Sequence, residues 1–184
     1  MNFNKHLDLE GKHAYLGASK YHWLNYSDDK LVESYNNYLA VEMGTRLHAF
    51  AKEAIELGVK LPRNKKTLNM YVNDAIGFRM TPEQPLFYSE NCFGTADTIA
   101  FSKNLLRIHD LKTGVTPASM NQLKIYNALF CLEYSVDPNT ISMISRIYQL
   151  NEIFEEEQNP DEIKDIMNRI IHFDKLIDRV KAGE

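Results

Sequence analysis

Cysteine is scarce in this chain, and long apolar runs are missing. Of its 184 residues only two, Cys92 and Cys131, are cysteines, which suits a reducing compartment better than a disulfide framework. No apolar run approaches the ~18 residues that a bilayer crossing needs, and residues 1–8 contain no apolar stretch of the kind found in signal peptides. We therefore expect a cytoplasmic protein with no membrane partner.

An excess of positive charge is also missing. The chain has 21 Lys and Arg against 25 Asp and Glu, a formal net charge of −4, which argues against a general nucleic-acid coat. Basic residues cluster in the stretch Arg63-Asn64-Lys65-Lys66, which follows Pro62 and reads as a loop. This stretch is either a solvated turn or a contact in which Arg63, Lys65 and Lys66 bind nucleic-acid phosphates, with an affinity that falls steeply with salt.

The composition that remains is that of a globular protein. Hydrophobic residues make up 44% of the chain and aromatic residues 11%, and the length fits one domain with a sizeable core. We expect a single domain over residues 1–184, with a helical N-terminal region over 1–60 and a core over about 40–150. A C-terminal helix over 161–181 has an apolar stripe that either covers the sheet or forms a dimer or trimer contact; the stripe consists of Ile163, Met167, Ile170, Ile171, Ile177 and Val180.

Two apolar runs, residues 93–101 and 105–114, flank a polar turn and predict a β-hairpin. Alternate residues of a strand share a face, so Asp110 and Lys112 point the same way while Leu111 points into the core. If Asp97 lies on that face of the neighbouring strand, two carboxylates and an ammonium group converge. Two acids can hold a hard divalent cation, and a lysine can stabilise the anion formed during attack on a phosphodiester. Otherwise, an Asp-x-Lys sequence at a strand end is a solvated edge or a salt bridge.

Helices are predicted on both sides of this hairpin. Residues 41–55 carry a core-facing stripe made up of Leu47, Phe50, Ala51, Ala54 and Ile55. His48 lies beside this stripe, either as a satisfied boundary residue or as a metal ligand. A second helix opens at 117–120, reaches about residue 134, and carries Gln122 and Tyr126 on one face.

The remaining segments complete an α-β-β-β-α-β order. We expect a helix near 67–77, a strand around 86–89 before the hairpin, and a strand with good alternation over 141–150. The acidic residues 155–157 then lead through Asn159-Pro160-Asp161 into the last helix.

Four short motifs occur in a recognisable order along the chain: Gly44-Thr45-x-x-His48, Gly94-Thr95-Ala96-Asp97, Asp110-Leu111-Lys112-Thr113-Gly114 and Gln122-x-x-x-Tyr126. Together they resemble the motifs of the PD-(D/E)XK nuclease superfamily, above all its RecB-like branch, which includes phage exonucleases. The resemblance implies an α/β fold with a restriction-endonuclease-like αβββαβ core, in which helices flank a central mixed sheet. It also implies a metal-dependent DNA nuclease, an exonuclease by preference, that acts in recombination, repair or phage DNA processing.

The resemblance assigns a metal-binding role to several residues. His48 matches the metal-ligating histidine of the first core helix, Asp97 the first acidic ligand and Asp110 the second. The backbone carbonyl of Leu111 would complete the coordination, and Glu90 is an accessory acid. Mg²⁺ suits an oxygen-rich site, and the histidine also suits Mn²⁺.

The resemblance also gives the catalytic side chains. Lys112 matches the catalytic lysine, which acts either as a base or as a cation beside the metal. Gln122 and Tyr126 match the helix that orients this lysine or contacts the DNA backbone. Asp97 and Asp110 belong to the catalytic set through the metal they would hold.

The chain departs from parts of the superfamily. Its iron–sulfur members need four cysteines, so no iron–sulfur cluster is expected here. No GxxxxGK[ST] phosphate-binding loop is present, so no ATP-driven helicase is fused within this polypeptide. The proline of the superfamily name is absent, because Thr95-Ala96 precede Asp97, as is ordinary in the RecB-like branch.

The resemblance further suggests a bacterial or phage-infected cell, a partner protein that anneals single strands, and a homo-oligomer. The alternative function is that of a catalytically silent binding protein on a nuclease fold, an inhibitor or assembly factor. Because the chain keeps every charged group of the motifs, we prefer the active enzyme.

Overall fold

The computed structural model describes residues 5–183. They divide into two compact units, with the boundary between Met43 and Gly44. The helices are α1 (Asp28–Glu56), α2 (Thr67–Gly77), α3 (Asn121–Glu133) and α4 (Pro160–Ala182), with 3₁₀ helices η1 (Leu7–Leu9), η2 (Ala18–Asn25) and η3 (Pro138–Thr140). The strands are β1 (Thr81–Ser89), β2 (Cys92–Ser102), β3 (Leu105–Leu111), β4 (Ser142–Gln149) and β5 (Glu152–Glu157). The boundary between the units falls inside α1.

An aromatic cluster organises the first unit. The Tyr15 hydroxyl donates a hydrogen bond to Ser34 Oγ at 2.6 Å, and the Tyr15 ring lies 4.9 Å from that of Tyr35 and 5.3 Å from that of Tyr38. The sequence predicts a helical region over residues 1–60. From residue 5 onward its helical segments are η1, η2 and α1, while residues 1–4 lie outside the described part.

A five-stranded mixed sheet, ordered β1-β2-β3-β4-β5, forms the centre of the second unit. The predicted hairpin is confirmed, since β2 and β3 pair antiparallel from Thr98↔His109 to Ser102↔Leu105. Its turn contains Lys103 and Asn104 at φ 51° and 58°, the left-handed backbone that matches the twist of a tight hairpin. Strands β3 and β4 are parallel and therefore need a crossover, which α3 supplies.

Three predicted boundaries were wrong, and one strand was not predicted. Strand β1 begins at Thr81 instead of near residue 86, and β3 ends at Leu111, so Lys112 follows the strand instead of lying within the predicted run 105–114. The helix that carries Gln122 begins at Asn121, so residues 117–120 precede it instead of forming its first turn. Strand β5 was not predicted: its mostly glutamate sequence resembles a solvated linker, yet it pairs antiparallel with β4 at the edge of the sheet. An edge strand is solvated on one side, and its charges discourage pairing with another chain.

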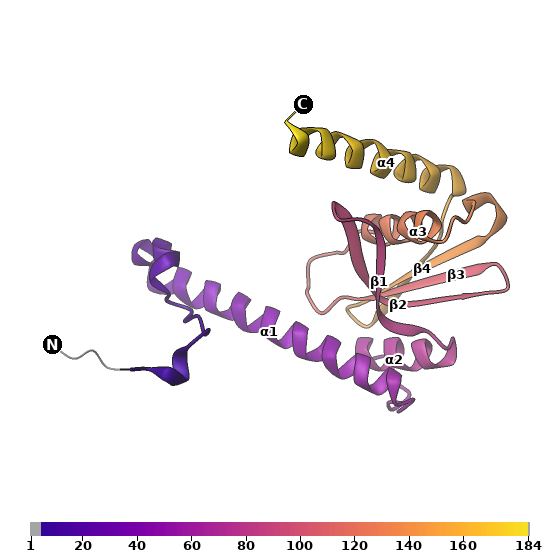
Figure 1. The fold of residues 1–184 in the computed structure, drawn as a ribbon. Helices are drawn as coiled ribbons and strands as arrows, with labels where there is room; N and C mark the ends of the chain where they lie inside the picture. Colours follow the sequence, from indigo (N-terminus) through magenta and orange to yellow (C-terminus); the bar gives the residue numbers. More distant parts are fainter. Residues whose placement is uncertain (1–4, 184) are drawn as a thin grey trace. The chain divides into compact units, whose positions relative to one another are not determined.

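Helices cover both faces of the sheet, so the second unit has the α/β architecture expected (Figure 1). Helices α3 and α4 enclose one core, which includes Leu86, Leu106, Ile108, Leu129 and Ile163. On the opposite face, α2 and the end of α1 enclose a second core, which includes Ala51, Ala54, Tyr71, Val72 and Tyr148. Among residues 5–183, no helix is both long enough and apolar enough to cross a bilayer.

The two predicted apolar stripes are only partly buried. In α1, Ala51, Ala54 and Ile55 are buried as expected, but Phe50 is 47% exposed. In α4, Ile163 is fully buried, whereas Val180 is 68% exposed. The periodicity identifies the helix in both cases, but it does not give which residues of the stripe another element covers.

Candidate metal centre

Strands β1, β2 and β3 bring three carboxylates to one region of the second unit. Asp97 lies on β2, and Asp110 lies on β3 just before its end. Glu83 lies opposite Asp97, because its neighbours Pro82 and Gln84 pair with Thr98 and Ala96. Glu83 has a φ of 48°, a left-handed conformation that costs a non-glycine residue about 1 kcal/mol or more. Such strain in a residue that carries a charged group often marks a functional site.

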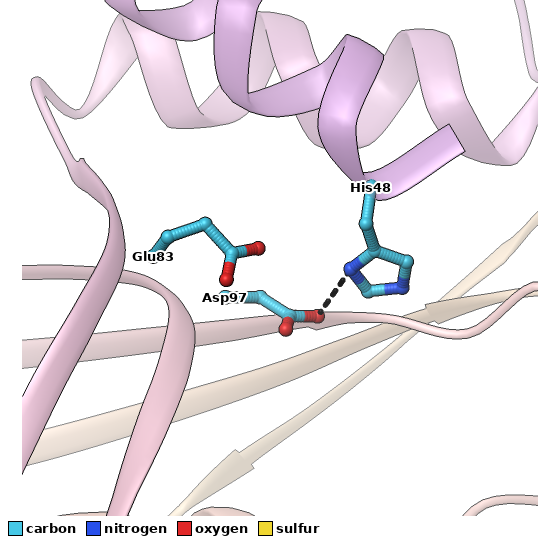
Figure 2. A group of neighbouring side chains, drawn as sticks. All are labelled: His48, Glu83 and Asp97. Atoms are coloured by element: carbon cyan, nitrogen blue, oxygen red, sulfur yellow. Dashed lines mark ion pairs between the residues drawn. The ribbon is translucent and has the colours of Figure 1, made fainter. Parts of the chain in front are cut away.

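His48, Glu83 and Asp97 form a cluster of possible metal ligands. One donor atom from each lies within 4.8 Å of the others. Figure 2 shows the imidazole of His48 and the carboxylate of Glu83 turned toward the Asp97 carboxylate, with His48 Nδ1 3.6 Å from Asp97 Oδ2. Two carboxylates and one imidazole form a donor set that suits Mn²⁺ and, through the oxygens, Mg²⁺.

Asp97 is held in an environment that disfavours its own negative charge. Burial raises the pKa of Asp97 to about 6, with a further increase from the charge of Asp110; His48 and the Leu111 amide act in the opposite direction. The Leu111 N–H donates to Asp97 Oδ2 at 2.8 Å and so fixes the orientation of the carboxylate. A bound cation would offset the repulsion that remains.

Asp110 is the more buried of the two aspartates. Burial raises its pKa, while the adjacent Lys112 ammonium opposes the rise. Its Oδ2 atom lies 3.0 Å from Lys112 Nζ, yet no hydrogen bond of good geometry reaches it among the described residues. A buried carboxylate oxygen that accepts no hydrogen bond can coordinate a cation. This is a second feature, after the raised pKa of Asp97, that suits metal binding.

Lys112, Gln122 and Tyr126 form a hydrogen-bonded chain next to Asp110. Lys112 Nζ donates to Asp110 Oδ1 at 3.1 Å and to Gln122 Oε1 at 2.8 Å. Gln122 Nε2 in turn donates to the Tyr126 hydroxyl at 3.1 Å. A Cβ on Gly94 would lie 3.0 Å from the Tyr126 ring, so glycine at this position leaves room for the tyrosine. These hydrogen bonds orient the Lys112 ammonium group toward Asp110.

The structure thus brings together most of the residues that the sequence singles out. This region contains six of them: His48, Asp97, Asp110, Lys112, Gln122 and Tyr126. The amide of Leu111 contacts the site, while a metal-binding role for its carbonyl stays a prediction.

Glu83, which the sequence did not single out, belongs to the cluster of possible ligands, and the role of Glu90 as an accessory acid stays a prediction. Glu90 is exposed in the turn between β1 and β2, seven residues before Asp97 along the chain, a span of about 20 Å on an extended strand. Nothing local in the sequence identifies Glu83 as a possible ligand. The prolines at 82 and 85 indicate only that this strand is irregular.

The basic loop leads into a contact with the β4–β5 turn, at the end of the sheet where β3 and β4 finish. Arg63, Lys65 and Lys66 are exposed between α1 and α2. The amide of Thr67, the first residue of α2, donates to Asn151 Oδ1 at 3.1 Å, in the β4–β5 turn. Three residues before Asn151, the Tyr148 carbonyl accepts a hydrogen bond from the Lys112 amide at 2.9 Å. The basic loop is therefore tied to the end of β4 that flanks Lys112.

No protein-family model matches the chain, and neither a curated protein nor a solved structure matches it significantly. Function is therefore argued from the geometry of the site.

Proposed function

We propose that the protein is a metal-dependent deoxyribonuclease that hydrolyses phosphodiester bonds, with exonuclease action as the preferred mode. The observation that carries this proposal is the convergence of Asp97, Asp110 and Lys112 at neighbouring strands, with His48 and Glu83 beside Asp97. Clustered carboxylates with raised pKa values next to an oriented lysine are characteristic of functional sites.

The order of elements supports a finer assignment. After α1 and α2, the chain runs through β1, β2, β3, α3 and β4 in the αβββαβ order of the PD-(D/E)XK core. The four motifs fall on the elements where that superfamily carries them: α1, β2, β3 with the residues just after it, and α3. We therefore propose membership of this superfamily, in its RecB-like branch.

The donor atoms present fit a divalent metal ion held by His48, Glu83, Asp97 and Asp110. When bound, Mg²⁺ or Mn²⁺ supplies positive charge to the scissile phosphate and lowers the pKa of an attacking water molecule. Without a cation the neighbouring carboxylates repel each other, and a bound cation would remove this repulsion. The same repulsion contributes to the raised pKa of Asp97, so the pKa and the metal affinity are linked.

Lys112 acts as a cation in this proposal. Its Nζ donates to both Asp110 and Gln122 Oε1, as an ammonium group does. From this position Lys112 would stabilise the negative charge that develops on the phosphate oxygens during attack. Gln122 and Tyr126 hold the lysine in place, so the ammonium group needs little reorganisation when the charge develops.

The substrate is a polyanion, and the net charge of the chain is negative. Contacts to the DNA backbone would therefore come from local groups, and Arg63, Lys65 and Lys66 are the candidates, because the loop that carries them leads into the contact with the β4–β5 turn. A strand-annealing partner and a homo-oligomer belong to the same proposal as properties of the RecB-like branch.

Incubation of the purified protein with end-labelled linear duplex and closed circular DNA tests the proposal, in Mg²⁺, in Mn²⁺ and in EDTA. We expect metal-dependent loss of linear DNA, abolished by Lys112→Ala. Because Lys112 is not a metal ligand, this variant should keep the thermal stabilisation by Mn²⁺. The matched control is Lys164→Ala, which removes a lysine paired with Asp137 at a different place in the fold.

The other outcomes separate the alternatives. Nicking of circles would indicate an endonuclease, and cleavage confined to RNA or single strands would change the substrate. If no nucleic acid is cleaved under any condition, the chain is better described as a binding protein on a nuclease fold.

A further inference from the structure

The segment that joins Lys112 to Gln122 has no regular secondary structure. It runs from the end of β3 to the start of α3 and includes Gly114, the exposed Val115 and Pro117. Its ends must nevertheless be placed accurately, because Lys112 Nζ and Gln122 Oε1 lie 2.8 Å apart. Because the segment has no regular hydrogen bonding of its own, contacts from other elements must order it.

Gln149, the last residue of β4, contacts three backbone groups of this segment. Its Nε2 donates to the carbonyl of Gly114 and to that of Thr116, both at 2.8 Å. Its Oε1 accepts from the amide of Ala118 at 3.1 Å. The Gln149 amide thus makes three hydrogen bonds, two as donor and one as acceptor, to the backbone of residues 114–118.

Gln149 lies where it can hold the segment between Lys112 and Gln122. The parallel pairing of β3 and β4 ends with Leu111↔Tyr148, so Gln149 follows directly beside the backbone of Lys112. Gln149 is only 3% exposed, so water competes little for these hydrogen bonds. A glutamine amide offers two donors and an acceptor at fixed relative positions, which neither leucine nor glutamate reproduces.

The beginning of the segment is packed closely as well. A Cβ on Gly44 of α1 would lie 2.8 Å from Thr113 Oγ1, so the helix backbone approaches the segment next to Lys112. The absence of a side chain on Gly44 thus leaves room for Thr113, and the Gln149 amide holds the middle of the segment.

We propose that Gln149 is a positioning residue that orders residues 114–118 and thereby holds Gln122 against Lys112. The catalytic part of this inference rests on the proposed nuclease function, whereas the ordering of the segment does not. The Gln149 side chain makes its hydrogen bonds to Gly114, Thr116 and Ala118, and among the described residues none joins it to the carboxylates or to the Lys112 ammonium group, so its effect passes through the segment.

The test compares Gln149→Leu and Gln149→Glu with the control Gln158→Leu. Leucine removes all three hydrogen bonds, while glutamate keeps an acceptor for Ala118 and loses the two donors. Gln158 is equally buried at 3% exposure, but its amide donates to Glu156 and its backbone pairs with Met143, at the opposite end of β4. The control therefore measures the cost of losing a buried glutamine amide elsewhere.

Three readouts are needed, and two of them do not depend on activity. In Gln149→Leu we expect hydrogen exchange of the Ala118 amide to become about tenfold faster, because its acceptor is lost. The side-chain amide signals of Gln122 in a ¹⁵N spectrum should shift or broaden. In DNA cleavage, kcat should fall by about a hundredfold while KM stays within about twofold, as expected for misplacement of a catalytic group. In Gln149→Glu the exchange of Ala118 should be slower than in Gln149→Leu, because the acceptor is kept, while kcat should still fall, because a carboxylate oxygen would face the carbonyls of Gly114 and Thr116.

Either of two results would overturn the inference. Unchanged Ala118 exchange and Gln122 signals would show that Gln149 does not order the segment. An unchanged kcat in a variant with a loosened segment would show that the ordering has no catalytic consequence. If the wild-type protein cleaves nothing, the nuclease proposal fails, while the exchange and Gln122 readouts still decide whether Gln149 positions the residues beside Lys112.

Discussion

Replacement of Asp97 by asparagine should stabilise the metal-free protein at neutral pH. The Asp97 side chain is only 15% exposed, and burial and the charge of Asp110 raise its pKa from 3.8 to about 6. The folded protein therefore holds the Asp97 proton more tightly than the unfolded chain does. The stabilising contribution is fully present below pH about 4 and is lost as the pH rises through about 6.

The size of the effect follows from this difference in pKa. A shift from 3.8 to about 6 corresponds to about 3 kcal/mol of unfolding free energy, as an order of magnitude. Asparagine carries no charge, and its Oδ1 can still accept the hydrogen bond from the Leu111 amide. We therefore expect Asp97→Asn in EDTA at pH 8 to raise the unfolding free energy by up to about 3 kcal/mol, and Tm by up to about 6–12 °C.

Thermal and urea unfolding at pH 4 and pH 8, with and without Mn²⁺, measure this effect. The variant should differ little from the wild type at pH 4, and Mn²⁺ should stabilise the wild type much more than the variant. Asp174→Asn is a control of opposite sign, because hydrogen bonds from Ser89 and Asn91 lower the pKa of Asp174. Equal or lower stability of Asp97→Asn at pH 8 in EDTA would refute the electrostatic description of the site.

Two further predictions concern the binding of metal and the binding of DNA. Glu83→Gln should weaken Mn²⁺ binding, measured by calorimetry, by at least about tenfold, because it removes one charged oxygen donor from the cluster. Glu90→Gln, in the exposed turn, should bind Mn²⁺ like the wild type, and equal affinities in both variants would remove Glu83 from the ligand set. The double variant Lys65→Ala/Lys66→Ala should reduce the slope of log K against log salt for duplex DNA by about 2, since about one counterion is released per phosphate contact. An unchanged slope, with Lys103→Ala as the reference, would place the basic loop outside the DNA interface.

Local patterns in the sequence were enough to predict most elements of the second unit. Alternation and a polar turn predict the β2–β3 hairpin, and 3.6-residue periodicity predicts α2 and the helices around it. Such patterns work because each element must bury one face, whatever its partners are. The same logic predicts that Asp110 and Lys112 point the same way, and the structure confirms that they meet, although Lys112 follows the end of β3.

Strand β5 and Glu83 show what local patterns miss. The β5 sequence has little alternation, and only the free edge of β4 makes it a strand. Glu83 reaches Asp97 through the register of β1 against β2 and through a left-handed backbone at its own position. Register is a property of the paired strands, so neither segment alone contains it.

The sequence by itself determined which residue types are available and on which faces of their elements they lie. The tertiary structure decided which of them share one environment. It buries Asp97 and Asp110 together, which raises both pKa values, and it brings Gln149 to the segment between Lys112 and Gln122. Burial, register and contacts between distant segments arise only when the chain folds, because each depends on groups far apart in sequence.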